Sequence, residues 1–314
     1  MNASLECLGR LRVDRSQGEP APHQPCLLLA ILCEIQAGHI TSPRVRLDTR
    51  LLARYHDLFE TVSGERHRAR PWMPLWALRN REGPSGALWR PHYSKAMRGV
   101  VKQLGQPKSL SQLEERFTEA SLDPELFAAL QAPATAREAC ALLSQRYLSA
   151  NHPAYQRLQD YLELALASGD YERHPERLAA AIHEPEPREA RSRAFRELVL
   201  EAYDYRCAAS RLRHITPDYH YLVEAAHLIP FAESQDDRPV NGIALTPNLH
   251  WAMDNHLIAP GPDLHWHLSP GIDGLIADNR WLCELDGRPL VLPRDPDLRP
   301  CREALAWRLE HLWR

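Results

Sequence analysis

One segment in the C-terminal half constrains the fold more than any other: EAAHLIPFAESQDDRPVNGIALTPNLHWAMDNH, from Glu224 to His256. A strand is predicted for YHYLVEAAHLI, a polar loop for PFAESQDDRPV and a second, short strand for NGIAL. A helix is predicted for TPNLHWAMDNH, with Thr246 as its N-cap and Pro247 at its first helical position. Strand, loop, strand and helix in this order describe a ββα unit.

Polar side chains lie at defined places in this ββα unit. His227 ends the first strand, Asn241 begins the second, and His250 lies on the helix. Asp254 follows His250 by four residues, so both side chains project from one face of the helix. An imidazole and a carboxylate at this spacing form half of a site for a divalent cation.

Phosphodiester hydrolysis requires this set of groups. Water must lose a proton near neutral pH, and histidine is the natural general base. The charge on the phosphate and on the departing 3′ oxygen must be neutralised, which one Mg²⁺-like ion does. Base and ion act on opposite sides of one phosphate, so we expect His227 to be the base and Asn241 to fix the loop. His250 and Asp254 are then the candidates for binding the ion.

Each of these residues alone also has an ordinary structural interpretation. A single histidine beside an apolar strand is more often a hydrogen-bonded structural residue, and a single aspartate on a helix is more often solvated. The combination is more specific, because the asparagine follows the first histidine by 14 positions and the second histidine follows nine positions later, in the required order of elements. It favours a nuclease.

The segment resembles a known family of nucleases. Three segments resemble the HNH endonucleases, which share the ββα-metal fold: YRCAASRLR, EAAHLIPF and NGIALTPNLHWAMDNHLIA. The segment LDGRPLVLP resembles the tail of bacterial HNH restriction-type nucleases. The resemblance covers about residues 190 to 314. It implies that His227 is the general base, Asn241 the structural asparagine and His250 a metal ligand. Asp254 takes the second ligand position on the helix, with one Mg²⁺ or Mn²⁺ ion per site.

The segment departs from the family pattern in two places. Many HNH proteins have Asp or His directly before the base, where this chain has Ala226, so Glu224, another nearby group or water completes the coordination. Many also carry paired CxxC zinc knuckles, whereas CAAS contains only Cys207. We therefore expect no structural zinc.

Residues 1–165 predict a mostly helical domain with a small sheet, which together with the ββα unit gives an α+β protein. A core helix that ends at Gly38 is predicted for APHQPCLLLAILCEIQAGHI, and an amphipathic helix for LLARYHDLFETV. Strands or extended loops are predicted for RPWMPLWALRN and GALWRPHYS. Further helices are predicted for LSQLEERF, DPELFAAL and AREACALLSQRYL, with Asp123 as an N-cap.

The charged, proline-containing stretch SGDYERHPERLAAAIHEPEPREARSR predicts a linker over residues 166–190, before a nuclease domain over 191–314. Arg191 and Arg193 lie among four arginines at the start of the helix that follows. This helix face is either solvated or directed at DNA phosphates.

The N-terminal segments APHQPCLLLAILCEI and PWMPLWALRN resemble McrA-like, modification-dependent restriction enzymes, in which a sulfur-binding domain recognises phosphorothioate DNA. The resemblance implies a small pocket built with a loop arginine and a tyrosine before a proline. Arg98 and Tyr147 match these positions, and His152 lies nearby as a further DNA-binding candidate. Leu148 stands where proline is expected and Asn151 where a small apolar residue is expected. A modified base or another DNA feature therefore stays open as the target, as does helix-end packing for Tyr147 and His152 and a phosphate contact for Arg98.

Composition indicates the cellular environment of the protein. The net charge of -3 neither supports nor excludes DNA binding, because a local basic face is sufficient. Seven scattered cysteines without a CxxC pair, no signal peptide and no membrane-spanning apolar run predict a cytoplasmic protein with reduced thiols and no membrane partner.

Together these observations predict a divalent-metal-dependent endonuclease that cuts modified or foreign double-stranded DNA in a restriction role. Each HNH unit cuts one strand, so double-strand cleavage predicts a homodimer. The alternative is a catalytically inactive HNH-fold protein that only binds DNA, and Ala226 is its best support. A toxin-type nuclease that cuts RNA is a third interpretation, which the two-domain organisation favours least.

Overall fold

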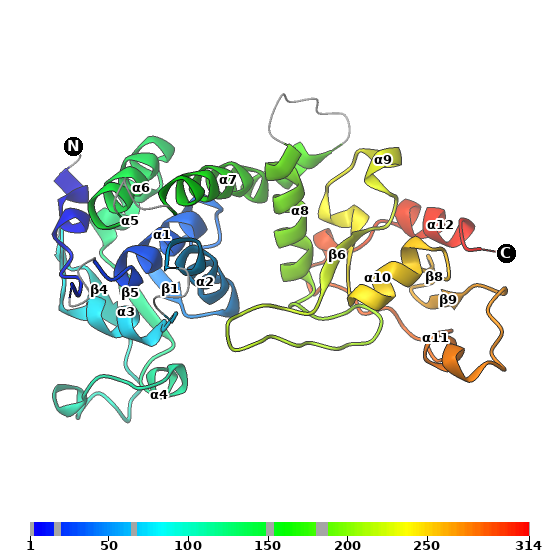
Figure 1. Cartoon of the computed structure of the whole chain (residues 1–314), viewed down its shortest axis with the longest axis horizontal. Helices are drawn as coiled ribbons and strands as arrows, with labels where there is room; N and C mark the ends of the chain where they lie inside the picture. Colours follow the sequence, from blue (N-terminus) through cyan, green and yellow to red (C-terminus); the bar gives the residue numbers. More distant parts are fainter. Residues whose placement is uncertain (1–2, 16–19, 64–67, 149–153, 180–187, 314) are drawn as a thin grey trace. The chain divides into compact units, whose positions relative to one another are not determined.

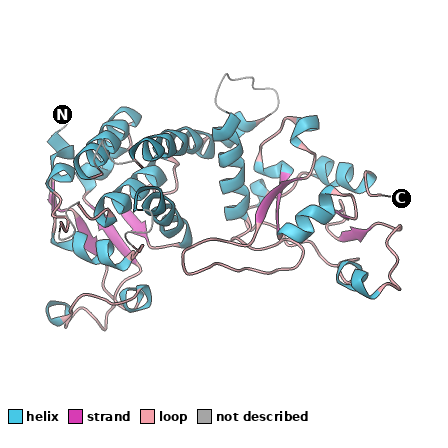
Figure 2. Cartoon of the chain, viewed as in Figure 1, coloured by secondary structure: helices cyan, strands magenta, loops and turns pink. Residues whose placement is uncertain are grey.

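The chain divides into two compact units, Met1–Arg173 and His174–Arg314 (Figure 1). Helices predominate and the strands are short (Figure 2), which confirms the predicted α+β class. No helix in the described part of the chain is long and apolar enough to cross a membrane. The computed structural model describes residues 3–15, 20–63, 68–148, 154–179 and 188–313.

Helices make up most of the first unit. Its α-helices are α1 (His23–Gln36), α2 (Thr49–Ser63), α3 (Trp72–Ala77), α4 (Leu110–Glu114), α5 (Pro124–Leu130), α6 (Pro133–Tyr147) and α7 (Tyr155–Arg173). Its 3-10 helices are η1 (Ala3–Arg10), η3 (Leu78–Asn80) and η4 (Val101–Gln103). Its strands are β1 (Arg44–Arg46), β2 (Glu82–Gly83), β3 (Gly86–Ala87), β4 (Trp89–Pro91) and β5 (Glu119–Leu122).

Helix α1 is the most buried element of the first unit. Every residue from Gln24 to Gln36 is buried, as expected for a helix that is apolar on nearly all sides. The helix packs against α2, α3, α6 and α7. Gly38 follows its end with a φ of +82°, a conformation that favours glycine. The predicted core helix is therefore confirmed.

A three-stranded antiparallel sheet in the order β1-β5-β4 packs one face into the core of this unit. The core face carries Val45, Ala120, Leu122 and Trp89, all of them buried. Strand β4 confirms the prediction for GALWRPHYS.

The prediction for RPWMPLWALRN was wrong, because this segment forms helices α3 and η3 instead of a strand. Pro71 occupies the N-cap of α3 and Pro74 lies in its first turn. Proline is tolerated at these positions because the first backbone N–H groups of a helix have no intrahelical acceptor. Helical spacing then buries Leu75 and Leu78.

The end of the first unit differs from the boundary expected at residue 165. Residue 165 lies inside helix α7, whose buried side continues through Ser168 and Tyr171 to Glu172. The helix therefore belongs to the first unit as far as Arg173. Of the expected linker, residues 180–187 lie outside the described part of the chain.

The second unit contains the predicted ββα order. Its α-helices are α8 (Arg188–Ala202), α9 (Phe231–Ser234), α10 (Pro247–Asp254), α11 (Arg280–Cys283) and α12 (Arg302–Glu310). Its 3-10 helices are η5 (Pro175–Leu178), η6 (Pro239–Asn241), η7 (Ala277–Asn279) and η8 (Pro296–Leu298). Its strands are β6 (Glu224–His227), β7 (Gly242–Leu245), β8 (Ile258–Pro260) and β9 (Trp266–Leu268).

Strands β6 and β7 form an antiparallel pair in which His227 lies opposite Gly242. Helix α8 packs against both strands and α10 packs against β6. A Cβ atom on Gly242 would lie 2.4 Å from Val199 Cγ2 and 2.8 Å from Phe195 Cε2. Glycine at this position therefore allows the close approach of α8 to the strand pair.

Two strand predictions in the second unit differ from the structure: one segment forms a helix, and the other forms a shorter strand than expected. WLCELDG forms α11 and a turn, and it buries Leu282 and Leu285 at helical spacing. In YHYLVEAAHLI only Glu224–His227 forms a strand. Apolar segments of this length fit a helix, a strand or a packed loop equally well, so periodicity alone does not distinguish them.

The guanidinium of Arg308, on helix α12, joins three parts of the second unit. Its side chain is only 1% exposed. It donates hydrogen bonds to the carbonyl oxygens of His227 (2.8 Å) and Leu228 (2.7 Å) at the end of β6, and of Met253 (3.2 Å) on α10. One buried side chain thus connects the C-terminal helix with the strand and the helix of the ββα unit.

We predict that Arg308→Met lowers the free energy of unfolding of the second unit by about 2–4 kcal/mol, because buried carbonyl groups lose a charged donor. Urea unfolding followed by tryptophan fluorescence measures the change. The control is Arg302→Met at the exposed start of the same helix, which we expect to cost less than ~0.5 kcal/mol. Equal destabilisation by both variants would contradict the role given to Arg308.

Candidate active site

His227 is the last residue of β6, and its ring is held from two sides. One face stacks on Phe195 of α8, with ring centroids 3.9 Å apart and planes 9° from parallel. Its Nε2 lies 3.0 Å from Oδ1 of Asp237, in the loop before β7. An ionised carboxylate only accepts hydrogen bonds, so the ring carries a proton on Nε2. In the neutral imidazole Nδ1 is then the atom with a lone pair.

The Asp237 carboxylate that orients His227 is itself buried and held in place. Its Oδ2 lies 3.5 Å from Nε of Arg191, and its backbone N–H donates to the carbonyl oxygen of Leu178. Arg191 also donates to Leu178, at 2.9 Å. A buried carboxylate requires such partners, because an uncompensated charge in the interior is costly. The result is a chain of contacts from α8 to the imidazole.

Asn241 is buried at the end of η6, directly before β7, and its amide holds the loop that follows His227. Its Oδ1 accepts from the backbone N–H of Ile229 at 2.9 Å. Its Nδ2 donates to the carbonyl oxygens of Ile229 and Asp236, both at 3.0 Å, and to Oγ of Ser234 at 3.3 Å. This loop ends at Asp237, so the amide fixes the segment that delivers the carboxylate to the histidine.

His250, on α10, lies between two carboxylates. Its Nδ1 is 2.8 Å from Oε2 of Glu224 on β6, and its Nε2 is 3.2 Å from Oδ2 of Asp254. Asp254, and after it Glu224, raises the pKa of His250 above its ordinary value of 6.5, although partial burial acts in the opposite direction. The His250 contact also lowers the pKa of Asp254 against the effect of its burial. These contacts favour the imidazolium, and a cation that binds there must displace this proton.

The side chains around His250 are of the kinds that bind a divalent cation. One imidazole and two carboxylates supply nitrogen and oxygen ligands of the kind that Mg²⁺ and Mn²⁺ accept. Only one ring nitrogen can bind an ion, so the carboxylate at the other nitrogen would fix the orientation of the ring. Both carboxylates are half-exposed, which leaves room for water or a phosphate oxygen.

Two of the predicted DNA-binding residues lie inside the protein. Tyr147 is buried, and its hydroxyl donates to the carbonyl oxygen of Leu8 and accepts from the N–H of Leu11. This burial and these hydrogen bonds agree with the packing interpretation of Tyr147. Arg191 is turned toward Asp237 and is mostly covered, so it supports the site instead of facing a phosphate.

The remaining DNA-binding candidates stay predictions. Arg98 is exposed on the turn after β4, where its Nε donates to the carbonyl oxygen of Tyr93 at 3.4 Å. Arg193 is half-buried on α8. His152 lies outside the described residues.

Sequence interpretation missed Asp237 and Arg308. Asp237 lies in PFAESQDDRPV, which was predicted only as a polar loop, and Arg308 lies in the C-terminal segment beyond the predicted ββα unit. No local pattern marks either of them, because each reaches its partners only through the folded path of the chain.

Comparison with known families agrees with this geometry. The sequence profile of the HNH endonuclease family matches residues 207–259, a range that contains every histidine and carboxylate described above from Glu224 to Asp254. The profile of the ScoMcrA-like DNA sulfur-binding domain matches residues 2–158, half of the chain. The chain belongs to the ScoMcrA-like family with a DNA sulfur-binding domain and an HNH endonuclease domain. The sulfur-binding domain lies in the first unit and the HNH domain in the second.

Among solved structures, a modification-dependent TagI restriction endonuclease is similar to this chain, with 18% sequence identity and a TM-score of 0.30. The similarity covers 38% of this chain and 37% of the other, so the chain spans little more than a third of the length of that structure. No curated protein sequence is significantly similar to the chain.

We predict that Asp237→Asn lowers the single-turnover rate of DNA cleavage by about 100-fold or more, because an amide can donate to Nε2 and favour the wrong tautomer of His227. Asp237→Glu should recover part of the rate, and DNA affinity should stay unchanged in both variants. The matched control is Asp236→Asn, whose carboxylate pairs with Arg238. A loss of DNA affinity equal to the loss of rate would assign Asp237 a merely structural role.

Proposed function

We propose that this protein is a divalent-metal-dependent endonuclease that hydrolyses phosphodiester bonds in modified DNA and acts in restriction. The observation that carries the proposal is the separation of two histidines with different partners. His227 is oriented by a buried carboxylate that leaves Nδ1 as its acceptor, whereas His250 lies among carboxylates suited to a cation. A base and a cation site on neighbouring elements are the two requirements for hydrolysis of a phosphodiester.

The side chains of the HNH domain have distinct roles in this reaction. Nδ1 of His227 accepts a proton from water as the water oxygen forms a bond to phosphorus. The bond from phosphorus to the 3′ oxygen breaks, and that oxygen takes a proton from solvent. Asp237 keeps the ring in the productive tautomer, and Asn241 keeps the loop in place. His250 with Glu224 or Asp254 would hold a divalent ion, Mg²⁺ or Mn²⁺ in this proposal, which would supply positive charge for the phosphate and the leaving oxygen.

Ala226 favours the alternative of an inactive HNH fold that only binds DNA, because many HNH nucleases have a ligand at this position. Ala226 is buried, and its position offers no ligand. Glu224 lies two residues earlier on the same strand, and its carboxylate reaches His250 at 2.8 Å. An oxygen donor is therefore available beside the imidazole from another position of β6, which supports the active nuclease.

The sulfur-binding domain supports a modified substrate. A nuclease that cut unmodified DNA would attack the DNA of its own cell, so a domain that selects the target is a functional requirement. We propose phosphorothioate or base-modified double-stranded DNA as the substrate, and we place the protein in the cytoplasm, where such DNA is met. The substitutions Leu148 and Asn151 in the expected pocket sequence are the reason to test both classes of modification.

The substrate proposal predicts which DNA is cut. Plain, base-methylated, hydroxymethylated and phosphorothioate duplexes are incubated with Mg²⁺ and with Mn²⁺, and products are separated on denaturing gels. We expect cleavage of at least one modified duplex, no cleavage of plain DNA, and loss of cleavage in His227→Ala. Binding without cleavage in all reactions would instead establish the inactive alternative. Faster cleavage of an RNA of the same sequence, incubated in parallel, would establish an RNA nuclease.

Double-strand cleavage predicts a homodimer on DNA, because one HNH site cuts one strand. Light scattering of the His227→Ala protein with its preferred duplex measures the mass of an uncleaved complex. We expect two chains of this variant per duplex, and nicked products from the wild-type protein wherever only one chain is bound. A single chain per duplex together with double-strand breaks would contradict this proposal.

A further inference from the structure

The sheet of the sulfur-binding domain has a basic outer face. Arg44 and Arg46 alternate with the buried Val45 along β1, so their side chains leave the sheet on the side away from the core. Across the sheet, the register aligns Arg44 with Ser121 of β5 and Ser121 with Arg90 of β4. We call the residues on this side the basic sheet face: Arg44, Arg46, Arg90, His92, Glu119 and Ser121.

The charges on the basic sheet face are not balanced. Glu119 receives hydrogen bonds from Arg44, at 2.7 Å from Nε, and an ion pair from Arg46 at 3.3 Å. These contacts, the Arg44 hydrogen bond first, lower the pKa of Glu119, so the carboxylate is ionised. Arg90 is exposed and has no hydrogen bond or ion pair with any other described residue. Three guanidinium groups against one carboxylate leave a net positive face.

The two arginines of β1 are also accessible. The side chain of Arg44 is 60% exposed and that of Arg46 78%, whereas Glu119 between them is 21% exposed. A polyanion that approaches the sheet therefore meets the guanidinium groups before it meets the carboxylate.

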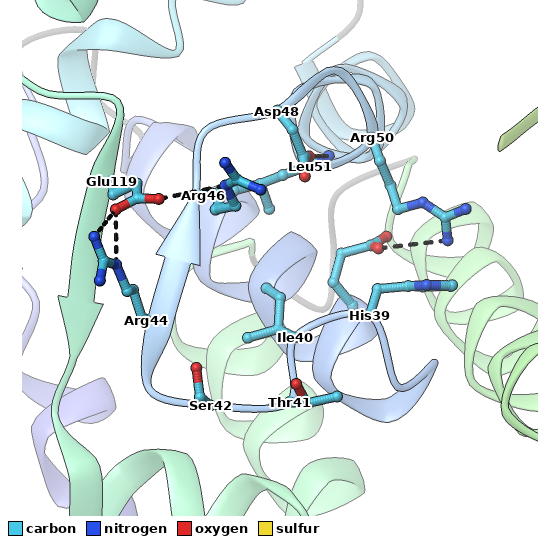
Figure 3. Close-up of a pocket in the computed structure, with 11 residues that line it drawn as sticks. His39, Ile40, Thr41, Ser42, Arg44, Arg46, Asp48, Arg50, Leu51 and Glu119 are labelled. Atoms are coloured by element: carbon cyan, nitrogen blue, oxygen red, sulfur yellow. Dashed lines mark hydrogen bonds and ion pairs between the residues drawn. The ribbon is translucent and has the colours of Figure 1, made fainter. Parts of the chain in front are cut away.

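A groove of about 460 Å³ runs beside β1, which is an edge strand of the sheet. Figure 3 shows Thr41 and Ser42 on the loop that leads into β1, with Arg44, Arg46 and Glu119 around the same hollow. The backbone N–H of Leu122 donates to the carbonyl oxygen of Pro43, and that of Leu47 donates to Thr118. These two bonds fix which residues of β1 are hydrogen-bonded to β5. The alternation of an antiparallel ladder then directs the backbone N–H groups of Arg44 and Arg46 to the open edge. Hydroxyl, backbone N–H and guanidinium donors thus meet in one place, and these groups bind DNA phosphates.

The basic sheet face belongs to the more basic part of an acidic protein. Residues 1–173 contain 22 Lys and Arg and 19 Asp and Glu, a net charge of +3, while residues 174–314 contain 16 and 22, a net charge of -6. The first unit is therefore the part of the chain to which a polyanion is attracted.

We propose that the basic sheet face binds the sugar-phosphate backbone of duplex DNA, independently of any modification. The proposal rests on the proposed function only in taking DNA as the ligand. A duplex presents a phosphate every ~3.4 Å along each strand. Arg44 and Arg90 flank β5 and are separated by about 10 Å of sheet, so each can meet a different phosphate. Contacts of this kind position the duplex while another part of the domain reads the modification.

The test is DNA binding by the full chain, with a short unmodified duplex, in EDTA so that no cleavage occurs, over a series of salt concentrations. We expect Arg44→Ala/Arg46→Ala to weaken binding by about 10-fold at low salt and to reduce the slope of log affinity against log salt by ~1.8, since each phosphate contact contributes about 0.9. The matched control is Arg137→Ala/Arg157→Ala, which removes two exposed arginines from α6 and α7. This control should retain the full slope.

Glu119→Gln provides a test with the opposite sign. Removing the carboxylate leaves both arginines free for phosphate, so we expect binding to strengthen by about threefold with a steeper dependence on salt. If Glu119 served only to hold the sheet together, the variant would bind more weakly and melt at a lower temperature. Thermal unfolding of every variant shows that the fold is retained.

The outcomes separate this proposal from the proposed function. Unchanged affinity in Arg44→Ala/Arg46→Ala, an equal loss in the Arg137→Ala/Arg157→Ala control, or weaker binding by Glu119→Gln would each overturn the basic sheet face as a DNA surface. None of these results depends on cleavage or on a modified base or backbone. A wild-type chain that binds neither the unmodified duplex nor any of the modified duplexes would overturn the proposed function as well.

Discussion

The second unit depends on one buried, charged side chain, that of Arg308. The guanidinium of Arg308 binds carbonyl oxygens at the end of β6 and on α10, the strand that carries His227 and the helix that carries His250. Its desolvation is costly, and directed hydrogen bonds to carbonyl groups offset that cost. In the proposed reaction the base and the cation site act on one phosphate, which requires a constant separation between their elements. A charged group with several fixed donors specifies that separation more narrowly than an apolar contact does.

The loop between β6 and β7 is also held by buried polar side chains that have hydrogen-bond partners. The side-chain amide of Asn241 makes four hydrogen bonds to that loop. Asp237, at the end of the loop, forms an ion pair with Arg191. A buried polar group costs free energy unless its partners are present, so the loop has one favourable path. That path determines which nitrogen of His227 carries the proton. The stability of the loop and the chemistry of the proposed base therefore depend on the same contacts.

Several elements could be predicted because their signals are local. The apolar run of α1, the Asp123 N-cap, which accepts from the N–H groups of Glu125 and Leu126, and the order β6, β7, α10 all follow from short-range sequence patterns. The failures concern RPWMPLWALRN and WLCELDG, where prolines and aromatic residues are compatible with strand and helix alike. Packing against the rest of the unit decides between them, and a local window does not contain that information.

For the candidate site, the sequence by itself determined which residues are candidates for the reacting groups: His227, His250 and Asp254, at the spacings that a ββα unit requires. It did not determine their partners. Asp237 beside His227 and Glu224 beside His250 follow from strand register and loop path, and Tyr147 and Arg191 turned out to face the interior. Chemical type is a property of each residue, whereas orientation, burial and proton position arise from contacts between residues distant in the chain. Only the tertiary structure brings those residues together.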